Sequence, residues 1–210
     1  MNRFFSLFLG FLIASNFIVV EGKSLREVAV FDMNKDFSTA QEQIENVDLN
    51  KVRETWLEWN NKVRRDLKLK EYKYSDVLDN TAAKWSNFSR DRGYINHKRL
   101  GQKNYYDFKG MKKWFESEGV KFKTVGGSSF VENIGWGYFK CKDDECTDEM
   151  VKSVKTTFDF FIGEKNRKYR PHYLSIVNPN YKEIGLGIAI DKKTKKYFLT
   201  VHYGTEILSN

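Results

Sequence analysis

The last part of the chain constrains the fold most, because it predicts a β-hairpin. The segments 183–190 and 196–204 are rich in apolar residues, and the turn-like sequence Asp-Lys-Lys-Thr-Lys of 191–195 separates them. In the first segment glycine alternates with apolar residues between Ile184 and Ile190, which predicts a tightly packed strand. A hairpin of this kind needs other elements to cover its apolar side chains.

Amphipathic helices precede this hairpin. The first begins after Asp48, a suitable N-cap, and its apolar face recurs every three or four residues, at Leu49, Val52, Trp56, Trp59, Val63 and Leu67. A second helix is expected between Ser75 and Gly93, a short third ends at Gly119, and Thr147 is expected to cap a fourth that ends at Gly163. Helices followed by strands predict an α+β domain with helices on an antiparallel sheet.

Composition favours a folded protein over a disordered chain. Of the 210 residues, 40% are apolar, and there are 17 Phe, 11 Tyr and 5 Trp. The net charge of +8 comes from lysines spread along the chain, which is typical of a solvated basic surface. Attraction to anionic walls, membranes or nucleic acid is the alternative. Because the sequence holds no nucleic-acid-binding motif of the zinc-finger or RNA-recognition type, we expect no specific nucleic-acid partner.

The N-terminus differs from the rest of the sequence. A short basic start is followed by an apolar stretch over 4–20, and Val20 and Gly22 are small enough for a signal-peptidase site. We therefore predict a signal peptide over 1–22, a polar arm or linker over 23–47, and a domain over 48–210 without a membrane span. The alternative is that the apolar stretch remains as a membrane anchor.

Two cysteines fit export to an oxidising compartment. Cys141 and Cys146 enclose four residues and would close a small disulfide loop there. The alternative, half of a zinc site, lacks a second cysteine pair or a nearby histidine. We expect a secreted, extracellular or periplasmic protein that is a monomer.

Both prolines of the chain flank one histidine. Pro171 precedes His172 directly, and Pro179 lies in the turn-like sequence Asn-Pro-Asn of 178–180. Because proline restricts its own backbone and that of the preceding residue, we expect a stiff loop that presents His172.

Several motifs together resemble the CAP superfamily of cysteine-rich secretory, antigen 5 and pathogenesis-related proteins. Its His-Asn-x-x-Arg motif is similar to Asn-Asn-Lys-Val-Arg at 60–64, and its Gly-Glu-Asn-Ile motif to Val-Glu-Asn-Ile at 131–134. Its Gly-His-Tyr-Thr-Gln-Ile-Val-Trp motif is similar to Pro-His-Tyr-Leu-Ser-Ile-Val-Asn at 171–178. The resemblance runs from Leu49 to the C-terminus and is closest to the bacterial branch. It implies an α-β-α sandwich, with helices on both faces of a small antiparallel sheet.

The resemblance also implies a cleft with two histidines and two glutamates. Carried over by motif, these are His97, Glu132, Glu164 and His172. The family's Trp-x-x-Glu is replaced here by Phe-Ile-Gly-Glu at 161–164. His97 and His172 are the expected ligands of a weakly bound divalent metal such as zinc, and a cation there would relieve repulsion between the carboxylates. From the residues alone, His172 could merely pin its loop, and Glu132 could be a buried carboxylate held by backbone N–H groups.

The expected function is that of a secreted binding module without catalysis. The resemblance implies a lipid or a sterol as partner, and the net charge of +8 suggests an anionic cell-wall component as the other candidate. The alternative is a hydrolase of cell-wall glycan or peptide that uses Glu132 and Glu164, or a metal-bound water. The sequence holds no G-x-S-x-G nucleophile motif. Alternation along the last strand makes His202 an ordinary strand side chain.

Overall fold

A computed structural model describes residues 44, 46–99 and 104–208. The predicted signal peptide and nearly all of the predicted arm lie outside these residues. The chain divides into two units, Met1–Lys35 and Asp36–Asn210, and the second contains every element described below. No helix within the described ranges is long and apolar enough to cross a membrane.

A four-stranded sheet forms the centre of the domain, in the order β1-β3-β4-β2. Its strands are β1 (Lys73–Tyr74), β2 (Phe130–Tyr138), β3 (Glu183–Asp191) and β4 (Lys196–Gly204). The predicted hairpin is confirmed, because β3 and β4 pair antiparallel through the turn over 191–196. β2 pairs with β4 in the same sense, whereas the two-residue β1 joins β3 in parallel.

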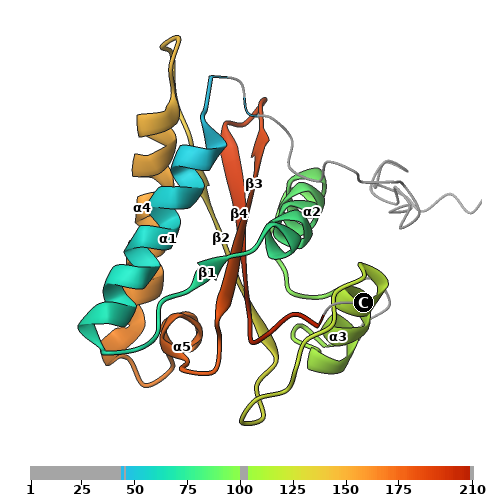
Figure 1. The fold of residues 1–210 in the computed structure, drawn as a ribbon. Coiled ribbons are helices and arrows are strands. Elements are labelled where there is room, and N and C mark those ends of the chain that lie inside the picture. Colours follow the sequence, from blue (N-terminus) through green and yellow to red (C-terminus); the bar gives the residue numbers. More distant parts are fainter. Residues whose placement is uncertain (1–43, 45, 100–103, 209–210) are drawn as a thin grey trace, which may run out of the picture. The chain divides into compact units, whose positions relative to one another are not determined.

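Helices cover both faces of the sheet, as Figure 1 shows. On one side lie α1 (Leu49–Asp66), α4 (Thr147–Ile162), the short 3-10 helix η2 (Gly163–Asn166) and α5 (Pro171–Val177). On the other lies α2 (Asp76–Arg92), with α3 (Phe108–Ser117) nearby. The expected α-β-α sandwich is therefore confirmed.

Most predicted helix boundaries agree with the structure. The Asp48 carboxylate accepts hydrogen bonds from the backbone N–H groups of Asn50 and Lys51, as an N-cap does. Gly93 ends α2 with a φ of 81°, which glycine adopts without strain.

The predicted role of Thr147 was wrong. Thr147 is the first residue of α4, and Cys146 precedes the helix without a side-chain cap. The Thr147 hydroxyl instead accepts the backbone N–H of Asp48, 2.7 Å away, and so links the starts of α1 and α4. This contact joins residues far apart in sequence, and local pattern therefore gives no sign of it.

The stretch around His172 is not the expected loop. Pro171 is the first residue of α5, and His172 is the second. Proline suits this position because its φ is already helical and the first N–H of a helix has no intrahelical partner. The proline therefore starts a helix that carries the histidine. The turn at Pro179 is confirmed.

Two glycines allow α2 to pack directly on β3. A Cβ atom at Gly185 would lie 2.2 Å from backbone atoms of Leu78 and Asp79, and one at Gly187 would lie 2.2 Å from backbone atoms of Ala82 and Ala83. The alternation of glycine with apolar residues thus makes room for a helix backbone.

Arg64 joins α1 to the end of α5 and to the segment that follows it. Its buried guanidinium donates hydrogen bonds to the backbone carbonyls of Ile176, Asn178 and Tyr181, at 2.9–3.2 Å, and lies over the ring of Tyr72. The arginine of the motif at 60–64 therefore has a structural role.

Candidate functional site

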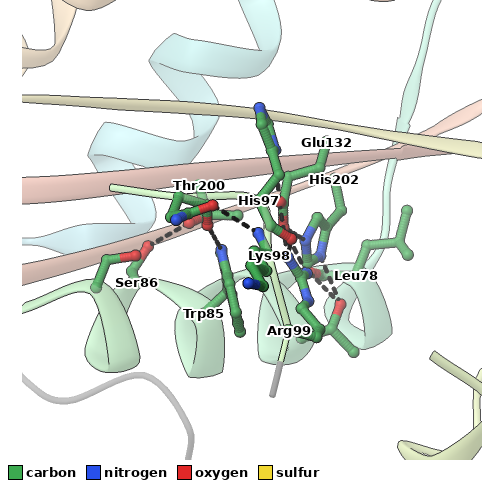
Figure 2. Close-up of polar contacts among 12 residues, drawn as sticks. Leu78, Trp85, Ser86, His97, Lys98, Arg99, Glu132, Thr200 and His202 are labelled. Carbon is green, nitrogen blue, oxygen red and sulfur yellow. Dashed lines mark hydrogen bonds and ion pairs between the residues drawn. The ribbon is translucent and has the colours of Figure 1, made fainter. Parts of the chain in front are cut away.

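Glu132 on β2 lies at the centre of a buried polar cluster, shown in Figure 2. Arg99 donates to both of its carboxylate oxygens, at 2.8 and 2.6 Å. His97 Nδ1 lies 2.8 Å from one oxygen, and His202 Nε2 lies 2.8 Å from the other. Four donors from three side chains thus saturate one carboxylate.

Arg99 keeps this carboxylate ionised. Burial alone raises the pKa of Glu132, but attraction and hydrogen bonds from Arg99, with further hydrogen bonds from His202 and His97, hold that pKa well below its usual range. The guanidinium in turn lies between the rings of Trp85 and Trp114, with its central carbon 3.5 and 4.3 Å from their centroids. The buried pair is therefore both charge-matched and packed.

His202 is a neutral partner in the same cluster. Burial lowers the pKa of this imidazole more than its contact with Glu132 raises it. A neutral ring that donates from Nε2 to Glu132 accepts the Thr81 hydroxyl at Nδ1, where the two atoms are 2.9 Å apart. His202 is a buried strand side chain, as expected, and it also positions Glu132.

His172 and Glu164 form a second histidine–glutamate pair. His172 Nδ1 lies 2.8 Å from one oxygen of Glu164, and the other oxygen accepts the backbone N–H of His172 at 3.0 Å. The carboxylate therefore caps the first turn of α5 and orients the ring at the same time. Phe161 stacks on the imidazole, with centroids 4.6 Å apart and ring planes at 11°.

Adjacent residues of β2 reach the two pairs. Glu132 contacts His97, while the side-chain amide of Asn133 donates to the backbone carbonyl of His172 at 3.2 Å. Successive side chains of a strand point to opposite faces of the sheet. Two adjacent residues of the edge strand β2 thus contact one member of each pair.

The four predicted site residues thus occur as two pairs. Among the described residues, the single set of three groups close enough to share a metal is Cys141, Asp143 and Glu149. Cys141 is joined to Cys146 in the predicted disulfide and offers no thiolate. His97, Glu132, Glu164 and His172 therefore do not form a closed set of three or four ligands.

Sequence reasoning missed Arg99 and undervalued His202. Arg99 is only two residues after His97, but a basic residue in a basic loop carries no signal of its own. His202 is directly opposite Glu132 in the pairing of β2 with β4. That register depends on the folded sheet, although a buried histidine facing a buried glutamate would have been a useful clue.

Comparison with known proteins identifies the family of this chain. The sequence model of the cysteine-rich secretory protein family, CAP, matches residues 57–203, more than half of the chain. The chain belongs to this family. A search of curated proteins finds no match.

Solved CAP structures share the fold. An outer surface protein from Borrelia burgdorferi is 12% identical, with a TM-score of 0.54 over 76% of this chain and 96% of that one. The CAP domain of enterococcal PrgA is 19% identical, with a TM-score of 0.51 over 76% of this chain and 63% of that one. At these identities the likeness concerns the fold alone. The name of the CAP family describes its members as secretory, and the disulfide fits an oxidising compartment.

Proposed function

We propose that this CAP-domain protein is exported and acts as a binding module, whose cleft takes a divalent metal or a small ligand through His97 and His172. The observation that carries this proposal is that each imidazole is held through Nδ1 by a carboxylate. Carboxylates that accept the Nδ1 hydrogen of an imidazole leave the Nε2 lone pair for a metal, as is common around metal-binding histidines.

The donor set limits the affinity. All the described hydrogen bonds of the His97 and His172 rings use Nδ1. Both oxygens of Glu132, and both of Glu164, are already engaged. A metal would therefore have two protein ligands and several positions left for water or a ligand, which agrees with weak binding. Arg99 already compensates the charge of Glu132, so that no bound cation is needed to compensate that charge.

The contacts of Glu132 disfavour the hydrolase alternative. A general acid needs a pKa raised toward the working pH, whereas Arg99 holds the Glu132 pKa low. A general base needs a free oxygen, and both are occupied by Arg99 and the two histidines. We therefore retain the non-catalytic module as the proposal.

Zinc titration of the exported protein tests the metal part. A metal that binds only the folded state stabilises it by about 2.7 kcal/mol at 100 times its dissociation constant. Because each kcal/mol shifts the melting temperature of a domain of this size by about 2–4 °C, saturating zinc should raise the midpoint by roughly 5–10 °C. His172→Ala and His97→Ala should reduce or abolish the rise. In calorimetric titration the same variants should lose part or all of the heat of zinc binding.

The matched control is Asp143→Asn, which alters the group beside the disulfide and should keep the rise. His202→Ala is unsuitable as a control because it would leave a cavity beside Glu132. The proposed metal site is wrong if the parent shows no shift, or if Asp143→Asn removes it and His172→Ala does not.

A further inference from the structure

We propose that reduction of the Cys141–Cys146 disulfide creates a site for a thiophilic divalent ion such as zinc or cadmium. The ligands are the two thiolates that reduction releases and the carboxylates of Asp143 and Glu149. The inference is independent of the proposed histidine site, because the two sites share no donor.

The donors already lie close together in the oxidised protein. Cys141, Asp143 and Glu149 each offer one sulfur or oxygen atom, and these three atoms lie within 4.8 Å of one another. Cys146 Sγ is bonded to Cys141 Sγ and so belongs to the same group. Two thiolates and two carboxylate oxygens are ligands that zinc binds with tetrahedral geometry. Carboxylates alone would suit calcium or magnesium instead.

Backbone oxygen atoms also surround the sulfurs. The carbonyl oxygen of Asp143 lies 3.3 Å from Cys146 Sγ and 3.9 Å from Cys141 Sγ. The carbonyl oxygen of Glu145 lies 3.8 Å from Cys141 Sγ. With the two carboxylates, these oxygens form a negative environment that opposes the ionisation of a free thiol. A bound cation reverses this effect, because it attracts thiolates and oxygen ligands alike.

Backbone hydrogen bonds hold the two cysteines in place independently of the disulfide. The N–H group of Cys146 donates to the carbonyl of Asn46 at 2.7 Å, and the carbonyl of Cys146 accepts the N–H of Met150 at 3.0 Å. Two residues before Cys141, the N–H of Phe139 donates to the carbonyl of Lys195 at 2.8 Å. The two sulfurs therefore stay near the carboxylates after the bond between them is broken.

A cavity gives a reductant and an ion access to the site. Its volume is about 260 Å³, and Cys141, Asp143 and Cys146 contribute to its lining. Cys141 is partly exposed, whereas Cys146 is 5% exposed. An attacking thiolate therefore reaches Cys141 Sγ more easily. Cys146 then leaves as a thiolate at the start of the 16-residue helix α4, where the helix dipole favours a negative charge.

Reduction by a dithiol balances without any further reactant. One thiolate of the dithiol attacks Cys141 Sγ, the Cys141–Cys146 bond breaks, and the second thiol then displaces Cys141 from the mixed disulfide. Two electrons and two protons pass to the protein, and the dithiol becomes a disulfide. The ion then replaces the two thiol protons, which go to the solvent. A disulfide oxidant reverses these steps and releases the ion.

Cadmium titration of the exported protein tests the site, because cadmium thiolates have a charge-transfer band in the ultraviolet. Protein that has been reduced with a dithiol and freed of it under nitrogen should show this band, saturating at one equivalent of cadmium. The oxidised protein should show no band. The reduced chain in denaturing urea should bind cadmium at least about tenfold more weakly, because the fold no longer brings the carboxylates to the sulfurs.

The variant Asp143→Asn/Glu149→Gln keeps both cysteines and should bind cadmium at least about tenfold more weakly. Changes even to groups that only orient a metal ligand typically cost about 10–100-fold in affinity. The matched control Asp144→Asn/Asp148→Asn removes the same charge from the same segment, outside the ligand set, and should bind as the parent does. Reduced His172→Ala should also keep the band, so that failure of the histidine site and failure of this site are distinguishable.

The inference is overturned if the reduced parent shows no thiolate band, or if the chain in urea binds cadmium as tightly as the folded protein. Equal losses of affinity in the two double variants would also overturn it, because only net charge would then matter. If neither double variant loses affinity, the cysteines alone bind the ion and the proposed ligand set is wrong. Circular dichroism checks the fold of each reduced sample, and a reduced parent that is unfolded even with cadmium contradicts the proposal.

Discussion

At the scale of single residues, Glu132 is the group on which the site depends most. It is 2% exposed, and its charge is compensated by Arg99 rather than by water. Removing one partner of a buried, hydrogen-bonded ion pair leaves the other charge uncompensated, at a cost of about 3–5 kcal/mol. The same carboxylate orients His97, so that folding and the proposed ligand binding share one residue.

This carboxylate should make the protein sensitive to acid. Because the folded pKa of Glu132 is depressed, its contribution to stability is present above the unfolded value near 4.3 and is lost as the pH falls. Urea unfolding between pH 7 and pH 3.5 should show the free energy of unfolding falling below about pH 5. Glu132→Gln should be less stable at pH 7 and should lose part of this pH dependence.

Glu132→Gln/Arg99→Met removes both charges and should be more stable than Glu132→Gln alone. Glu116→Gln changes an exposed ion pair with Lys112 and should retain the parental pH profile. A parental profile in Glu132→Gln would contradict the assigned role of the carboxylate.

At the scale of elements, the contact between α2 and β3 places the site. α2 carries Thr81, which contacts His202, and leads into the loop with His97 and Arg99. The close approach of α2 to the sheet depends on Gly185 and Gly187. Added volume at either glycine must move a helix backbone rather than a flexible side chain.

Gly187→Ala should therefore destabilise the domain by about 1–3 kcal/mol, the usual cost of overpacking. Gly163→Ala is the matched control, because a Cβ atom added there would meet nothing within 4 Å and its φ of −63° suits alanine. Urea unfolding of both variants measures the difference. Equal stabilities would show that α2 can shift at no cost and that its close contact with β3 is unimportant.

At the scale of the whole molecule, the disulfide and the predicted signal peptide both indicate export. Cys141 and Cys146 are joined just before α4, and Cys146 is buried. A loop this short stabilises the fold by about 2 kcal/mol in the chain-entropy description. The bond persists in an oxidising compartment. The predicted signal peptide would deliver the chain there.

The intact mass of the exported protein should correspond to a chain that begins near Lys23 and holds one disulfide. Small residues at Val20 and Gly22 and the isolated cysteine pair motivate this expectation. Alkylation without reduction should modify neither cysteine, and alkylation after reduction should modify both. A retained leader, or two thiols that react without reduction, would contradict it.

Sequence-based predictions were correct mainly where the residues that carry the signal lie close together in the sequence. Periodicity located α1 and its cap at Asp48, and alternating glycines located β3, because each depends on residues close in the sequence. Thr147 and Pro171 were misjudged because the same residue types suit more than one position near a helix start. Motif resemblance indicated Glu132 and His172, but not the division of the site into two pairs.

The sequence by itself determined the fold class, most element boundaries and the family, since periodicity, turn residues and motif order are properties of neighbouring residues. Only the tertiary structure decided which donors surround Glu132. Arg99 lies 33 residues away from it along the chain and His202 lies 70 away, and both meet it through the sheet register and the packing of α2. A buried charge takes its pKa from such distant partners, because the low-polarity interior makes nearby groups, rather than water, its solvent.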